Sequence, residues 1–182
     1  MLSLFLNRAG SDNKHSRHTK AEYIMSDQDF TRTFSVTQTP EEVFAAINNV
    51  RGWWSEEIEG NTDKQGDVFA YHYRDIHRCT IKLIELVPAR KAVWHVLDNY
   101  FSFTQDKTVE WTNTKIRFEI SRKGDKTEVR FTHEGLVPEN ECYEACSEGW
   151  STYVSSLQSL IAKGKGTPNV GEPMTDTERA LS

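Results

Sequence analysis

The sequence predicts a single α+β domain in which a curved antiparallel sheet wraps around one long C-terminal helix. A length of 182 residues suits one domain with a sizeable core, stable without disulfides or a bound metal. The middle of the chain holds a series of alternating apolar and polar segments, and its end holds a long amphipathic segment. A strongly curved sheet leaves space beneath such a helix, so we expect an apolar cavity between them.

The first predicted elements are a strand and two short helical pieces. Residues 30–36 alternate as a strand does. Thr39 fits an N-cap before a proline, and Glu42 completes a capping box, so a short helix is predicted to run through residue 47. The tryptophan pair at 53–54 then lies in a turn or a second short helix.

Four or five strands are predicted next. Each has one apolar and one polar face, as antiparallel sheets with one solvated face do. They cover residues 67–73, 76–87, 91–97, 114–120 and 127–133. Gly124-Asp125 is predicted as the hairpin turn between the last two strands. Residues 98–113 are irregular and aromatic, which predicts a loop or partly ordered flap.

A long helix is predicted at residues 139–162, with Gly164 as its C-terminal stop. Its apolar or small residues recur at intervals of three and four: Cys142, Cys146, Gly149, Trp150, Tyr153, Leu157 and Leu160. The predicted organisation is a disordered extension at 1–24, one ligand-binding domain at 25–165 and a disordered tail at 166–182.

The composition excludes several classes of partner. The net charge is −5, which argues against nucleic acid and against an anionic membrane surface. No segment approaches the roughly 20 apolar residues of a membrane span. Three cysteines form no secreted-type disulfide framework, so we expect a cytoplasmic protein with reduced thiols. No motif indicates a cofactor, and none is predicted.

Several motifs resemble the SRPBCC (START-like, helix-grip) superfamily, and more narrowly its branch similar to the C-terminal domain of the activator of Hsp90 ATPase. The resemblance spans about residues 28–165. The motifs occur in the expected order: 39–44 (TPEEVF), Trp53-Trp54, Gly60, Gly66, 85–88 (ELVP), Val93-Trp94, Glu110-Trp111, 132–136 (THEGL), Gly149-Trp150 and 157–160 (LQSL). The resemblance implies the helix-grip fold, whose members include lipid carriers, receptors, cyclases and chaperone activators.

Three functions are compatible with these observations. The leading hypothesis is non-catalytic binding of a small hydrophobic or aromatic molecule in the internal cavity. The second is modulation of an Hsp90-type ATPase through a protein-interaction surface. It is the less favoured of these two because the sequence does not show the separate N-terminal domain of the full activator. The third is a cyclase- or hydratase-like enzyme. An exposed edge strand would also support a homodimer.

The predicted ligand-binding side chains lie on inward faces or beside the cavity. They are Trp54, Phe69, Tyr71, Trp94, Trp111, Phe118, Phe131, His133, Trp150 and Tyr153. His133 points inward by strand alternation. A neutral histidine there would act as a catalytic base or, as we favour, as a hydrogen-bonded core residue. Trp111 and Trp150 are equally compatible with lining a pocket and with filling a core.

Two pairs of residues suggest metal binding only weakly, and no metal site is predicted. His72 and His77 face each other if Arg74-Asp75 is a two-residue turn, but no third ligand is evident nearby. Cys142 and Cys146 lie one helical turn apart, a spacing that more often marks small core residues.

Overall fold

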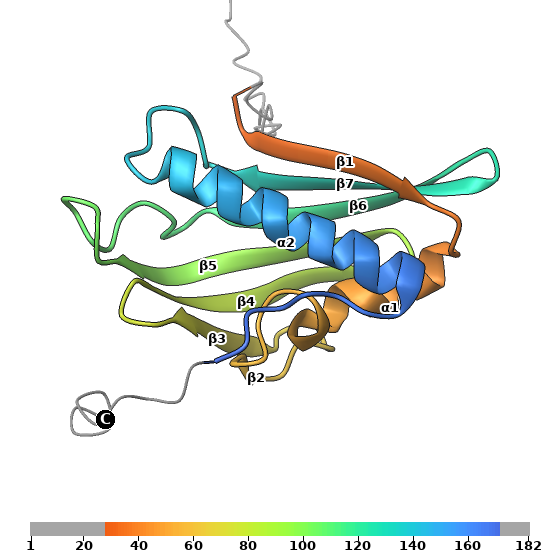
Figure 1. Cartoon of the computed structure of the whole chain (residues 1–182), viewed down its shortest axis with the longest axis horizontal. Coiled ribbons are helices and arrows are strands. Elements are labelled where there is room, and N and C mark those ends of the chain that lie inside the picture. Colours follow the sequence, from red (N-terminus) through yellow and green to blue (C-terminus); the bar gives the residue numbers. More distant parts are fainter. Residues whose placement is uncertain (1–27, 172–182) are drawn as a thin grey trace, which may run out of the picture.

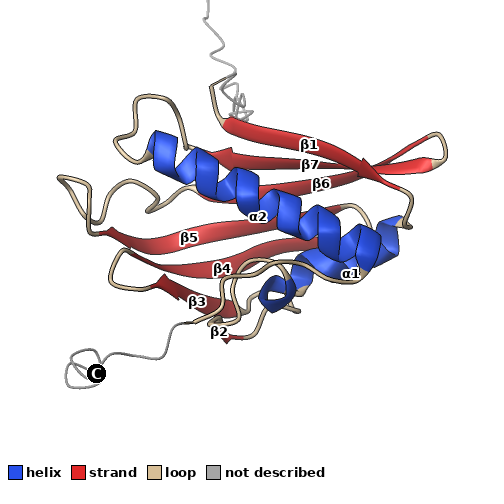
Figure 2. Cartoon of the chain, viewed as in Figure 1, coloured by secondary structure: helices blue, strands red, loops and turns tan. Residues whose placement is uncertain are grey.

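The protein consists of one antiparallel sheet crossed by one long helix (Figures 1 and 2). This computed structural model describes residues 28–171. The helices are α1 (Pro40–Asn48), the 3-10 helix η1 (Val50–Gly52) and α2 (Tyr143–Lys163). The strands are β1 (Phe30–Val36), β2 (Glu59–Gly60), β3 (Val68–Tyr73), β4 (His77–Val87), β5 (Lys91–Phe101), β6 (Lys115–Lys123) and β7 (Lys126–Glu134).

The seven strands follow the order β1-β7-β6-β5-β4-β3-β2, and every neighbouring pair is antiparallel. In Figure 1, α2 lies across one face of the sheet, with α1 near its C-terminal end. Buried side chains of the sheet, α1 and α2 form one hydrophobic core. This architecture confirms the predicted helix-grip fold, including two short helical pieces after the first strand.

The predicted capping box is present at the start of α1. The Thr39 hydroxyl accepts a hydrogen bond from Glu42 N at 3.3 Å, and a Glu42 carboxylate oxygen accepts one from Thr39 N at 2.8 Å. This reciprocal capping box satisfies two backbone donors that the first turn cannot pair internally. The helix then buries Val43 and Ile47 against the core.

The hairpin turns decide which side chains meet. Lys123 pairs with Lys126, so Gly124-Asp125 is the predicted two-residue turn, with Gly124 at φ 64°. The β3–β4 turn differs, because Tyr73 rather than His72 pairs with His77. The predicted His72–His77 pairing is therefore wrong.

Strand β5 is four residues longer than predicted. Residues 98–101, expected in an irregular loop, pair with residues 77–80 of β4. The polar Asp98-Asn99 pair interrupts the apolar alternation of the sequence. Hydrogen bonds to the neighbouring strand nevertheless continue the ladder, as tertiary context often overrides local preference. This extension brings Asn99 into the interior, where it is 3% exposed.

The packed domain extends beyond the expected boundary at residue 165. Asn169 N donates to Trp54 O at 2.9 Å, and Asn169 O accepts from Glu56 N at 3.0 Å. The Thr167 amide also donates to Ser156 Oγ at 2.7 Å. These bonds hold residues 167–169 against the domain. The expected disorder of residues 1–24 and of the end of the tail falls outside the described residues.

Candidate functional site

The predicted site residues form one aromatic layer between α2 and the sheet. Phe118 and Phe131 lie opposite each other on β6 and β7, and the Phe131 and Trp150 ring centroids are 4.7 Å apart. The Trp54 ring lies 5.0 Å from Trp150 and 6.0 Å from Tyr153. The structure therefore brings side chains from strands, α2 and a loop into one cluster.

The aromatic layer is closed. Trp54 and Trp94 are 0% exposed, Trp150 is 1% and Trp111 is 4% exposed. Residues lining an open cavity would be partly accessible to water. In the described part of the chain, these four rings therefore border no open space, and the expected cavity is occupied by the protein's own side chains. The physical reason is their size, since each ring reaches across the gap to contact another.

Two tryptophan stacks give the layer its internal order. Trp53 and Trp54 lie at an interplanar angle of 23°, and Trp54 lies at 3° to Trp94. Farther along α2, Trp111 lies at 11° to Trp150 with 5.5 Å between ring centroids. The second stack joins the β5–β6 loop to α2, so movement of that loop would expose one face of Trp150.

His133 sits at the centre of a closed hydrogen-bond chain. Trp150 Nε1 donates to His133 Nδ1 at 2.8 Å, so Nδ1 is the unprotonated nitrogen. His133 Nε2 then donates to Thr114 Oγ1 at 2.9 Å, and that hydroxyl donates to Trp111 O at 2.5 Å. Burial, with a smaller contribution from His77, lowers the pKa of His133 to about 3. Both nitrogens are engaged, an arrangement that suits a neutral structural histidine better than a catalytic base.

A second buried polar group was not predicted. His77 Nε2 lies 3.0 Å from Asn99 Oδ1, and burial lowers the pKa of His77 to about 3. The His77 ring stacks on Phe101 at 4.2 Å and meets the edge of Trp111 at 4.6 Å. Alternation continued beyond residue 97 would have placed Asn99 on the inner face of the strand, but the polar residues around it obscured this pattern.

Two phenols close the side of the layer near the C-terminal segment. Tyr71 Oη and Tyr153 Oη lie 3.2 Å apart, and Asn169 Nδ2 donates to both, at 3.2 and 2.7 Å. Burial raises the pKa of Tyr71 above its ordinary value. Asn169 thus fastens the C-terminal segment to two predicted site residues.

Cys142, at the N-cap of α2, and Cys146, in its first turn, form a pair of buried thiols. A hydrogen bond with Cys146, burial and the neighbouring Glu110 all raise the pKa of the Cys142 thiol. Within residues 28–171, no three His, Cys, Asp or Glu side chains lie close enough together to hold a metal ion. His72 instead lies 3.4 Å from a Glu57 carboxylate oxygen, outside the aromatic layer.

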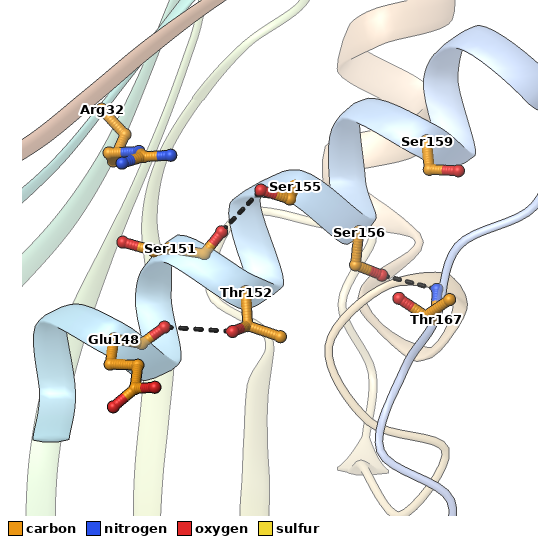
Figure 3. A pocket seen from close by; sticks show the side chains of 8 residues that line it. All are labelled: Arg32, Glu148, Ser151, Thr152, Ser155, Ser156, Ser159 and Thr167. Carbon is orange, nitrogen blue, oxygen red and sulfur yellow. Dashed lines mark hydrogen bonds between the residues drawn. The ribbon is translucent and has the colours of Figure 1, made fainter.

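A surface groove runs along α2, away from the aromatic layer (Figure 3). Its lining residues are Arg32, Glu148, Ser151, Thr152, Ser155, Ser156, Ser159 and Thr167. Ser151 and Ser155 donate to the carbonyl oxygens of residues four positions earlier, so their protons are already used within the helix. The groove contains none of the predicted site residues.

Similar solved structures share the fold. The Aha1 dimer from Colwellia psychrerythraea is 20% identical, with a TM-score of 0.62, and the match covers 76% of this chain and 98% of that one. DynU16, from the dynemicin biosynthetic locus, is 14% identical with a TM-score of 0.57; the match covers 79% of this chain but only 50% of DynU16. CalU16 from Micromonospora echinospora is 14% identical with a TM-score of 0.52, covering 74% of this chain and 76% of CalU16.

Sequence comparison identifies the family. No curated protein matches the sequence. Among the described residues, no helix is long and apolar enough to cross a membrane, and the cytoplasmic location stays a prediction. The family model described as "Activator of Hsp90 ATPase homolog 1-like protein" matches residues 37–162, which is most of the chain. The chain therefore belongs to the Activator of Hsp90 ATPase homolog 1-like family, within the helix-grip superfamily that its motifs resemble.

Proposed function

We propose that this protein binds a small, largely apolar aromatic molecule in the layer between α2 and the sheet. The observation that carries the proposal is the continuous aromatic lining of this layer, interrupted by a few oriented polar groups. Such a combination is typical of small-molecule sites, where apolar walls supply affinity and a few polar atoms fix orientation. The similar fold of DynU16 and CalU16 is compatible with this role.

Binding requires the closed layer to open. The β5–β6 loop, residues 102–114, is the segment whose movement would open the layer, because its Trp111 covers one face of Trp150 and two hydrogen bonds to side-chain carboxylates fasten the loop to the segment before α2. Gln105 N donates to a Glu141 carboxylate oxygen at 2.8 Å, and Cys142 N donates to Glu110 Oε2 at 3.0 Å. Breaking a few exposed or half-buried hydrogen bonds needs less free energy than opening the sheet.

Native mass spectrometry of the purified full chain tests the proposal. A discrete extra mass that disappears on denaturation would support a bound small molecule. The same preparation should then be incubated with 2-acetylnaphthalene, a neutral aromatic ketone, and titrated by calorimetry. Saturable one-to-one binding is the expected result. No extra mass and no saturable binding up to the solubility limit would contradict the proposed function.

The variant Phe118→Trp tests whether the ligand binds in the layer. Phe118 is fully buried and contacts Trp53, Trp94 and Phe131, so a larger ring would fill space that the ligand needs. We expect weaker ketone binding with a retained folded spectrum. Equal affinity in this folded variant would place the ligand elsewhere on the protein.

A chaperone-directed role is the second candidate. It is supported by the family description and by three large apolar side chains that are exposed: Ile76 at 39%, Phe103 at 46% and Val109 at 59%. Ser102 N donates to Ile76 O, so the first two lie on adjacent segments. Stimulation of Hsp90 ATP hydrolysis by the full chain, lost in Phe103→Ser, would support this role over small-molecule binding.

Two further hypotheses, on oligomeric state and on catalysis, are testable. The Colwellia protein is a dimer, and β1 is an edge strand here, so we include a homodimer in the proposal. Light scattering after size-exclusion chromatography distinguishes one chain mass from two. A cyclase- or hydratase-like reaction through His133 is favoured less, because its two nitrogens already have partners. His133→Ala would abolish turnover if that reaction occurs.

A further inference from the structure

Two polar groups at one end of the aromatic layer lack partners. Trp111 Nε1 and Asn99 Nδ2 are buried, and neither forms a hydrogen bond with any residue of the described chain. Both belong to side chains that contact His77: Asn99 through a hydrogen bond at 3.0 Å, Trp111 through ring contact at 4.6 Å. An unpaired buried donor costs about 1–3 kcal/mol, so two around one ring are unusual.

Both unpaired groups are donors. An indole nitrogen can only donate, and the Asn99 carbonyl oxygen already receives the proton of neutral His77. Two neighbouring acceptors are occupied: His133 Nδ1 accepts from Trp150, and Trp111 O accepts from Thr114. Because His77 Nε2 donates to Asn99, His77 Nδ1 is an acceptor at this end of the layer, and the two buried donors remain unpaired beside it.

Burial at this end disfavours an anion. Trp111 is 4% exposed and Asn99 is 3% exposed, so a ligand that reaches both donors is removed from water. A buried carboxylate without a paired cation costs far more free energy than a buried carbonyl or ether oxygen that accepts hydrogen bonds.

We infer that the site binds a neutral aromatic molecule carrying a carbonyl-type oxygen, and that this oxygen accepts hydrogen bonds from Trp111 and Asn99. The inference rests on the proposed function and adds the chemical class of the ligand and its orientation. The apolar part of the ligand lies along Trp150, and the oxygen lies beside His77. The β5–β6 loop, which carries Trp111, closes over the bound molecule.

Two ligands of matched shape test the inference on the full chain. 2-Acetylnaphthalene has the acceptor oxygen, and 2-isopropenylnaphthalene replaces that oxygen with a methylene group. We expect the ketone to bind about three- to tenfold more tightly, the range that one net hydrogen bond supplies. In ¹⁵N-correlated spectra, which show the indole N–H groups of the five tryptophans, the ketone should move the Trp111 signal downfield and the alkene should not.

Three variants assign the donors. Trp111→Phe removes one donor while keeping a ring, and Asn99→Asp replaces the other with an acceptor of the same shape. Each should lower the ketone-to-alkene affinity ratio, and the double variant should bring it close to one. His72→Gln is the control, because His72 lies 3.4 Å from a Glu57 carboxylate oxygen and outside the aromatic layer. Its ratio should stay at the wild-type value.

The outcomes separate this inference from the proposed function. Equal binding of both ligands to the wild type would overturn the inferred requirement for an acceptor oxygen and would leave the proposed binding in the layer intact. A ketone preference that is undiminished in both Trp111→Phe and Asn99→Asp would overturn the assignment of the donors. Binding of neither ligand would overturn the inference together with the proposed function.

Discussion

Acidification should destabilise this fold through its two buried histidines. His77 and His133 have an ordinary pKa of 6.5, and burial lowers both values to about 3 in the folded protein. Between these values the unfolded chain binds more protons than the folded chain. The free energy of unfolding is therefore at its full value above pH 6.5 and falls as the pH drops toward 3.

The size of the effect follows from the two pKa shifts. Well below pH 6.5, each histidine removes about 1.4 kcal/mol from the free energy of unfolding per pH unit. Lowering the pH from 7 to 5 should cost about 2 kcal/mol for each histidine and about 4 kcal/mol for the pair. This is a large part of the roughly 5–15 kcal/mol that stabilises a typical domain.

Urea unfolding at pH 7, 6 and 5, followed by tryptophan fluorescence, measures this loss. Exposed carboxylates titrate mostly below this range, which isolates the histidines. His133→Gln and His77→Gln should each reduce the pH dependence to about half, and the double variant should nearly remove it. A wild-type free energy of unfolding that is the same at pH 5 and pH 7 would refute the reasoning, as would an unchanged slope in the double variant.

Three further substitutions test local features of the fold by urea unfolding at pH 7. Thr39→Ala removes the hydroxyl that caps α1 and should cost about 0.5–1 kcal/mol; no loss would mean that the capping bond is not formed in solution. Gly60→Ala should cost more than Gly66→Ala: both residues have positive φ (99° and 96°), but only the new Cβ at Gly60 lies 2.4 Å from Val68 O. Equal losses would exclude that clash. Asn169→Ala should cost about 1 kcal/mol and speed hydrogen exchange at the Glu56 amide; unchanged exchange would show that the two phenol contacts do not hold the C-terminal segment.

The parts of the fold predicted from sequence are those encoded by local patterns. Strict alternation placed Phe118, Phe131 and His133 on the inner face, and a hairpin dipeptide placed the turn between β6 and β7. Both signals reside within a few neighbouring residues. The capping box likewise needs only four residues, and it forms as predicted.

The parts that escaped prediction depend on contacts distant in sequence. Asn99 enters the interior because β4 extends the ladder to Phe101, and only the partner strand determines this. The pairing of Tyr73 with His77 depends on a turn without a clear sequence signature. Closure of the aromatic layer depends on how ring sizes and rotamers combine in three dimensions, which alternation does not describe.

The unpaired donors bear on whether this layer is only a core. Phenylalanine would fill much of the space that Trp94 and Trp111 occupy without burying an N–H. Asn99 would accept the hydrogen bond from His77 equally well if its amide nitrogen, Nδ2, reached water. Instead, four such donors lie unpaired inside the described domain, on Trp54, Trp94, Asn99 and Trp111, each lowering stability by about 1–3 kcal/mol. Trp150 and Trp53 show that the same fold can pair an indole, with His133 and with Ile47 O. Because pairing is available elsewhere in the layer, the unpaired groups around His77 fit a site whose acceptor arrives with a ligand.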